Sequence, residues 1–200
     1  MFLLLPSGVI AMILAVPIIR VVFERGQFDP YSTAITAGAL GYSAIGLWAF
    51  GGMKITVSVF HALQDTRTPV KVAGFCLVLN LILNFILMYP LKVSGIALAS
   101  SLSGIVSFCL LLFILHRKIG GLLGVMVDFF WRMTVPLLVL AVITLRTYNT
   151  IPIENAWVKL GVTILIGMVS FLGTAWIFRI EPAVVLWQWV DTKVLKGEEK

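Results

Sequence analysis

The chain has 200 residues, of which 60% are hydrophobic and only 12% are charged, and its mean hydropathy is +1.05. Soluble domains average about 45–50% apolar and 25% charged residues, so this composition excludes a soluble globular protein and indicates an all-α integral membrane protein. The net charge of +6 comes from basic residues that are spread along the chain. This spread gives little support to nucleic-acid binding, which favours a basic patch or stripe.

Six apolar segments are long enough to cross a bilayer, because one crossing needs about 20 helical residues. They cover approximately residues 2–23, 32–62, 70–89, 93–115, 129–148 and 157–179. The loops are short, which predicts six transmembrane helices and leaves no room for a separate soluble domain. Cys76 and Cys109 lie inside apolar runs without metal-ligand spacing, so we interpret both as small buried hydrophobic residues.

The second segment is too long for a straight crossing at about 1.5 Å per residue. Gly51 and Gly52 lie within it next to Lys54, which predicts a bend or a cytoplasmic extension. Its start is marked by Asp29 as N-cap with Pro30 at the first helical position. Thr68 with Pro69 repeats this pattern and predicts the start of the third helix.

The positions of Lys and Arg predict the orientation, since cytoplasmic loops are enriched in both. The side that holds the second loop, the fourth loop and the C-terminus carries nine of them, against five on the other side. We therefore expect both termini to be cytoplasmic. Residues 181–200 place apolar and charged residues at helical spacing, which predicts a cytoplasmic amphipathic tail with Trp187 and Trp189 at the headgroups. A frayed helix end is the alternative.

The third segment carries two amides, Asn80 and Asn84, which lie four residues apart and therefore on one helix face. The short connection near Lys92 makes the third and fourth segments antiparallel neighbours, which places Ser100 at nearly the depth of Asn84. Two interpretations are open. The amides join the two helices by hydrogen bonds, or they form a hard-cation site with the Ser100 hydroxyl and a backbone carbonyl near Ile96. No carboxylate lies at this depth, so such a site needs negative charge from elsewhere.

Lys54 is the one ionisable residue well inside a predicted span. Either its ammonium reaches the interface along the flexible side chain, or it faces a hydrated cavity and meets an anionic substrate. His61 and His116 lie near span boundaries without Cys or carboxylate partners at ligand spacing, and no phosphate-binding loop occurs. The sequence therefore predicts a protein that is not an enzyme.

Three stretches, in order, resemble one family. They are VFERGQF at residues 22–28, FHALQDTRTPVKV at residues 60–72 and VSGIALASS at residues 93–101. They are similar to motifs of the MurJ (MviN) family of lipid II flippases, and the second resembles a loop between two late helices of that family. The Asp65, Arg67 and Pro69 positions belong to this loop motif.

The resemblance implies an all-α membrane fold with six transmembrane helices that correspond to the last six of a fourteen-helix flippase. This family lies in the multidrug/oligosaccharidyl-lipid/polysaccharide exporter superfamily. Residues 1–118 would then be four helices of a C-terminal lobe, residues 119–180 two additional helices that accommodate a polyprenyl tail, and residues 181–200 the tail segment. The N-terminal lobe of the family is missing and would be a partner of this chain.

The resemblance also implies functional residues. Asn80, Asn84, Ser100 and the carbonyl of Ile96 match positions assigned to a sodium site in this family. Asn84 stands where an acidic residue can occur, and an acidic ligand from an earlier helix is absent from this chain. Lys54 matches a position that is commonly basic. No cofactor is expected besides Na⁺ as a coupling ion.

The function implied is transport of lipid II across the bacterial cytoplasmic membrane by alternating access, as part of a longer flippase. The substrate would be a polyprenyl-diphosphate-linked saccharide, with the lipid bilayer as its source and destination. Two alternatives stay open from the sequence. One is a flippase for another polyprenyl-linked glycan, and the other is a truncated product that acts as a non-transporting membrane scaffold.

Overall fold

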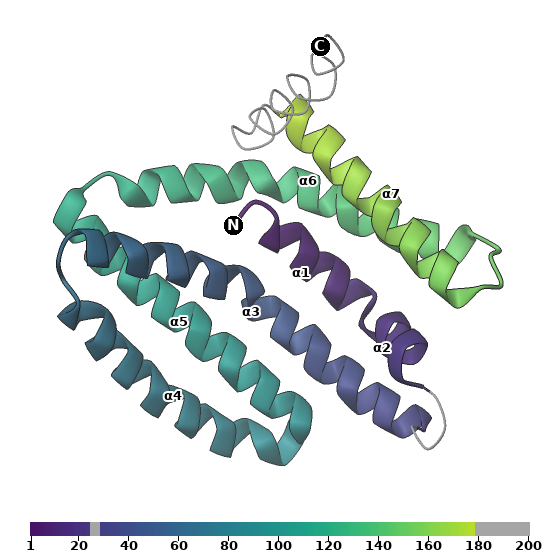
Figure 1. The fold of residues 1–200 in the computed structure, drawn as a ribbon, viewed down its shortest axis with the longest axis horizontal. Coiled ribbons are helices and arrows are strands. Elements are labelled where there is room, and N and C mark those ends of the chain that lie inside the picture. The colour runs from purple at the N-terminus through teal and green to yellow at the C-terminus, as the bar shows by residue number, and fades with distance from the viewer. Residues whose placement is uncertain (25–28, 179–200) are drawn as a thin grey trace, which may run out of the picture.

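The computed structural model describes residues 1–24 and 29–178, and all regular structure in this part of the chain is helical (Figure 1). The helices are Leu4–Ile13 (α1), Ala15–Phe23 (α2), Pro30–Ala62 (α3), Arg67–Leu91 (α4), Val93–Ile119 (α5), Leu122–Thr150 (α6) and Ala156–Ile177 (α7). Five of them, α3 to α7, are long and apolar enough to cross a membrane, and α1 with α2 adds a sixth if the bent pair is one span. The predicted fold class is therefore confirmed, while the predicted tail at residues 181–200 lies outside the described residues.

The first predicted span is not one continuous helix. It is divided at Leu14 into α1 and α2, whose axes meet at 74°. Proline has no N–H, so Pro17 cannot donate the helical hydrogen bond to the carbonyl of Ile13. On either side of the break the helical pattern is kept: the Leu14 N–H donates to the carbonyl of Ile10, and the Ile18 N–H donates to the carbonyl of Leu14. The prediction of one continuous helix over residues 2–23 is therefore wrong, although Pro17 was a signal for the break.

The second predicted span is the uninterrupted 33-residue helix α3, about 50 Å long, and its axis changes direction about midway in Figure 1. The Asp29 N-cap is confirmed, because its carboxylate accepts the Ser32 N–H at 2.8 Å. Hydrogen bonds from the side chain and from the backbone of Ser32 lower the pKa of Asp29. The start predicted for the next helix is wrong. Helix α4 begins at Arg67, and Asp65 instead of Thr68 supplies the acceptor at its N-terminus.

Helices α4 and α5 form an antiparallel hairpin, and α5 lies along α3 (Figure 1). Small residues allow this close approach, as is common between membrane helices. A Cβ on Gly46 of α3 would lie 2.7 Å from the Cα of Ser101 in α5, and one on Gly104 would meet the ring of Phe50 at 2.6 Å. The Ser101 hydroxyl donates to the Tyr42 carbonyl at 2.7 Å, which joins α5 to α3 directly.

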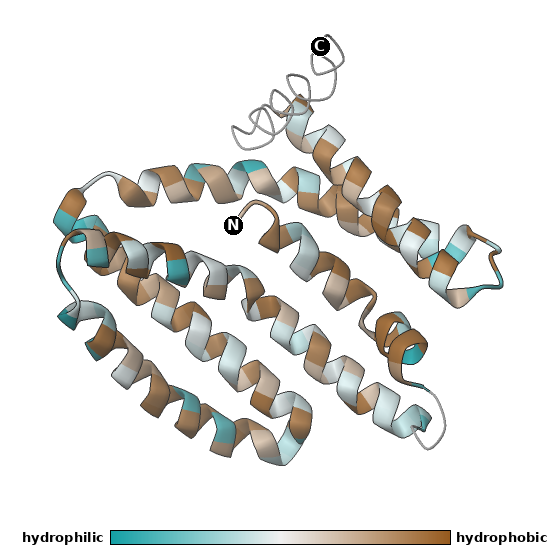
Figure 2. Ribbon diagram, in the orientation of Figure 1, coloured by the Kyte–Doolittle hydropathy of each residue, from teal (hydrophilic) through white to brown (hydrophobic). Residues whose placement is uncertain are grey.

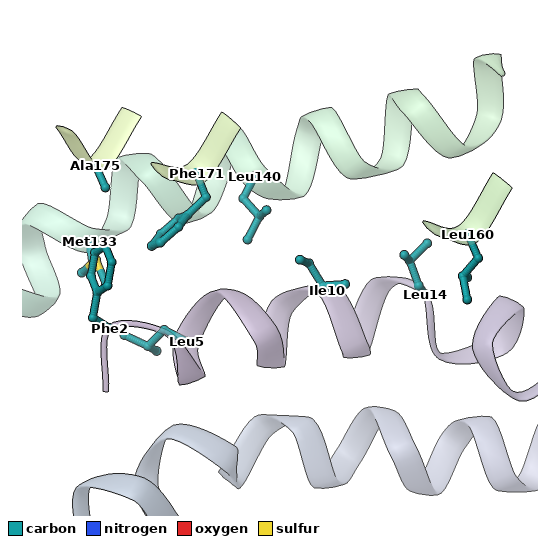
Figure 3. Packing of buried hydrophobic residues seen from close by; sticks show 9 residues of the cluster. All are labelled: Phe2, Leu5, Ile10, Leu14, Met133, Leu140, Leu160, Phe171 and Ala175. Carbon is teal, nitrogen blue, oxygen red and sulfur yellow. The ribbon is translucent and has the colours of Figure 1, made fainter. Parts of the chain in front are cut away.

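Helices α6 and α7 form a second pair that is joined to the rest mainly through α1 (Figure 1). Figure 3 shows the buried cluster that connects them, with side chains from the N-terminal segment and α1 facing those from α6 and α7. The rings of Phe2 and Phe171 lie 5.2 Å apart between centroids. The cluster consists of Phe2, Leu5, Ile10, Leu14, Met133, Leu140, Leu160, Phe171 and Ala175.

The helices are rich in apolar residues, as the brown segments of the ribbon in Figure 2 show, and many of their large apolar side chains are exposed. On α4, Val70, Leu77 and Phe85 are between 61% and 70% exposed, which fits a surface that faces lipid rather than water. Cys76 is buried as predicted, whereas Cys109 is exposed and the prediction for it is wrong. An apolar run does not tell which helix face meets a neighbour and which meets lipid.

Candidate functional site

Polar side chains meet between α4 and α5. The amide nitrogen of Asn80 donates to the hydroxyl of Ser103 at 3.1 Å and approaches that of Ser100 at 3.5 Å. The amide nitrogen of Asn84 donates to the carbonyl oxygen of the Asn80 side chain at 2.9 Å. The structure thus brings Asn80, Asn84 and Ser100 together and adds Ser103 to them. The bond to Ser100 comes from Asn80, one turn from Asn84, with which the sequence had aligned Ser100 in depth.

The hairpin geometry explains why these residues meet. Asn84 and Ser100 lie equally far from Lys92 in the two antiparallel helices. Lys92 makes the sharp connection with a φ of 51°, a conformation that non-glycine residues rarely adopt. Ser103 follows Ser100 by three residues and so lies on the same helix face. Ser103 was not among the predicted site residues, although its spacing from Ser100 was the signal for this position.

The cluster offers several oxygen atoms and no charge. The side-chain oxygen of Asn84 is buried and has no hydrogen-bond partner within the described residues, which is uncommon for a buried acceptor. Ile96 lies one turn before Ser100, and its side chain is exposed, so only its backbone is suited to a polar role. Amide, hydroxyl and carbonyl oxygens are ligands that hard cations prefer.

Lys54 lies on α3 and is not part of this cluster. Its side chain is exposed, and its carbonyl oxygen accepts the Ser58 hydroxyl at 3.1 Å. His61 is also exposed and shares this face of α3 with Lys54 and Ser58. A polar face on an otherwise apolar membrane helix indicates contact with water or with another polar surface.

The loop motif between α3 and α4 joins three helices. The Asp65 carboxylate forms an ion pair with Lys118 at the end of α5 and accepts the hydroxyl of Thr68 at 2.7 Å. The Lys118 ammonium also lies 5.6 Å from the centroid of the Phe60 ring of α3. Pro69 is buried, whereas Arg67 is exposed. The structure therefore gives Asp65 a role in packing, which the sequence did not show.

The ion pair with Lys118 and the bonds from Thr68 hold the pKa of Asp65 well below its ordinary value of 3.8. A lowered pKa means that the carboxylate stabilises the folded chain above the pKa of the unfolded state, and that this contribution is lost as the pH falls through the folded-state pKa. The Asp65→Asn variant should therefore melt at a lower temperature than the parent protein at pH 7, and the difference should shrink below about pH 4.

Thermal melts of both proteins across this pH range measure the effect. Asp128→Asn is the control, because Asp128 pairs with Arg132 within α6 and joins no second helix. If both variants lower the melting temperature equally at pH 7, Asp65 does not stabilise the contact between helices.

An apolar cavity of about 470 Å³ lies between the start of the chain, α3, α5 and α6. Its walls include Gly52, Thr56, Phe108, Leu115 and Phe129. The hydroxyl of Thr56 donates to the Gly52 carbonyl at 2.9 Å, so this polar group is satisfied within its own helix. The cavity is therefore suited to apolar groups only.

The geometry defines the class of protein. Helices with exposed apolar side chains enclose an uncharged polar cluster and leave one polar helix face exposed, which is the arrangement of a multi-pass membrane protein. A family model described as "Lipid II flippase MurJ" matches residues 1–169. The chain belongs to this family.

Individual relatives agree with the family match. The chain is 33% identical over 185 residues to the probable lipid II flippase MurJ of Rickettsia prowazekii, covering 88% of this chain and 36% of the relative. It is 37% identical to the lipid II flippase MurJ of Thermosipho africanus over 56% of this chain and 24% of the relative. A solved structure of lipid II flippase MurJ in an inward closed conformation superimposes with a TM-score of 0.76 at 30% identity, covering 88% of this chain and 36% of that one. The chain covers between 24% and 36% of the length of these three proteins.

Proposed function

We propose that this chain is the C-terminal part of a transporter that moves lipid II across the bacterial cytoplasmic membrane. The observation that carries the proposal is the family match over residues 1–169. The relatives are named as flippases, which move a lipid without making or breaking bonds. The polar cluster inside an apolar helix pair supports transport, because such groups are costly in a membrane and tend to mark substrate or ion pathways.

The transport would proceed by alternating access, in which this chain moves against a lobe that lies outside it. Lys54 then faces a hydrated cavity and pairs with the diphosphate of the substrate, while the polyprenyl tail stays in lipid. The exposed polar face that Lys54 shares with Ser58 and His61 supports this assignment. A polar surface of the lobe that lies outside this chain would pack against this face of α3.

A sodium ion would couple to this movement at Asn80, Asn84, Ser100 and the carbonyl of Ile96. The buried, unpaired oxygen of Asn84 supports the proposal, since a bound cation would satisfy it. The described cluster holds no carboxylate, so the ion would take its negative partner from a part of the protein outside this chain. Both termini would be cytoplasmic, as the distribution of Lys and Arg indicates.

Complementation tests the proposed function. A bacterium is depleted of its own lipid II flippase and given either this chain or a fusion to the N-terminal portion of a relative. Survival and outer-leaflet lipid II are then scored. Rescue by the fusion supports the proposal. If the inserted, well-expressed fusion fails, transport of another polyprenyl-linked glycan or a scaffold role would replace it.

The fusion also tests Lys54. Loss of a charged hydrogen bond to a phosphate costs at least about tenfold in binding, so Lys54→Gln should reduce lipid II transport by about that factor. Lys54→Arg should retain most of the activity, because it keeps the charge. Ser58→Ala on the same face serves as a control. Equal activity of the Gln and Arg variants would contradict the role of the charge.

A further inference from the structure

A second apolar groove lies beside the cavity described above, and Leu112 of α5 lines both. Its volume is about 460 Å³, within the usual range for ligand pockets. The groove is lined by Ile105, Val106, Cys109, Leu110, Leu112, Phe113 and Leu123. Cys109 and Phe113 are exposed, so the groove opens on the outer surface of α5, where a membrane helix meets lipid.

A cation lies at one end of this groove. The Arg117 guanidinium is 4.7 Å from the centroid of the Phe113 ring, and Phe113 is part of the groove wall. Stacking on a ring leaves the N–H groups at the edge of a guanidinium available for a phosphate. The ion pairs within the described residues are Arg20–Glu24, Asp65–Lys118 and Asp128–Arg132, so Arg117 has no acidic partner in that part of the chain.

The start of α6 adds further positive character to the same place. Leu123, which also lines the groove, is the second residue of α6. The N-cap residue Gly121 makes no side-chain capping hydrogen bond. The N–H of Leu123 donates to Nδ1 of His116 at 3.4 Å. A helix N-terminus carries a partial positive charge that favours anions. It strengthens the site that Arg117 and the groove define.

We propose that this groove binds an acyl chain of an anionic phospholipid whose phosphate pairs with Arg117. The charges favour a phospholipid over a polyprenyl diphosphate, because a single guanidinium without an acidic partner in the described part of the chain matches the single charge of a phosphodiester. The neighbouring Lys118, which a diphosphate would also need, is held by Asp65. The lipid would fill the space beside the α5–α6 junction and hold the N-terminal end of α6 against α5.

Native mass spectrometry of the protein, purified in mild detergent, tests the proposal. The added probes are phosphatidylglycerol, phosphatidylcholine and undecaprenyl diphosphate. The parent protein should retain phosphatidylglycerol in preference to phosphatidylcholine. Arg117→Gln should lower the retention of phosphatidylglycerol about fivefold, the effect of one basic residue near an anionic lipid surface, while Arg117→Lys retains it. Arg67→Gln is the matched control, because Arg67 is an exposed arginine away from the groove.

A second variant tests the groove itself. Cys109→Trp fills it and should abolish retention of phosphatidylglycerol, whereas Cys109→Ala should leave retention unchanged. Equal losses for Arg117→Gln and Arg67→Gln would overturn the proposal, as would full retention by Cys109→Trp. Displacement of phosphatidylglycerol by undecaprenyl diphosphate in an Arg117-dependent manner would also overturn it, and would assign the groove to a polyprenyl lipid.

Discussion

Replacing Gly95 by alanine is expected to destabilise the protein by about 1–3 kcal/mol, the usual cost of overpacking. An added Cβ would overlap the carbonyl oxygen of Leu87 and lie 2.6 Å from its carbonyl carbon. Both are backbone atoms of the adjacent helix α4, so no side-chain rotation relieves the clash and the helices must separate. The free energy of unfolding in mixed micelles measures the effect.

Gly74→Ala is the matched control for this variant. Gly74 lies on the same hairpin, but no atom lies within 4 Å of a Cβ built there. Its stability should stay unchanged or rise slightly, since alanine favours a helix more than glycine does. If Gly95→Ala is as stable as Gly74→Ala, α4 and α5 do not approach each other as closely as the structure shows.

Replacing Asn80 by alanine is expected to have two effects. It removes the acceptor of the Asn84 amide and the donor to Ser103, which should cost about 1 kcal/mol for interhelical hydrogen bonds in a membrane. It should also abolish stabilisation by sodium. In the fusion with an N-terminal lobe, Na⁺ at ten times its dissociation constant should raise the free energy of unfolding of the parent protein by about 1.4 kcal/mol. The free energy of unfolding of the variant should not change with Na⁺.

Melting curves in NaCl and KCl of equal ionic strength separate these effects. Asn149→Ala is the control, because Asn149 is exposed at the end of α6. A parent protein that gains no stability from Na⁺, while Asn80→Ala still loses about 1 kcal/mol, would contradict the sodium site. The amides would then serve only to join α4 and α5.

The polar cluster shows how far the sequence can be interpreted. Helical periodicity places Asn80 and Asn84 on one face, and a connection of few residues forces α4 and α5 to be antiparallel neighbours. These two constraints are local, so the approach of the amides to Ser100 was predictable, although Asn80 and not Asn84 makes the hydrogen bond. The choice of Ser103 as the shorter contact depends on the rotation of α5 about its axis, which packing against α3 determines.

The ion pair of Asp65 with Lys118 was not predictable in this way. The two residues lie 53 positions apart, and the motif that contains Asp65 indicated the family without indicating a contact. Likewise, Cys76 and Cys109 both lie in apolar runs, but only the arrangement of the helices determines that one is buried and the other lines a groove on the surface.

The sequence by itself determined the membrane class, the approximate limits of the spans and the amides that share a helix face, because these follow from composition and from periodicity along one segment. The tertiary structure alone decided the contact of Asp65 with α5 and the surface position of Arg117 and Cys109. These features depend on which helices pack together and how each is rotated. That choice is made by contacts between distant segments, and no local pattern encodes it.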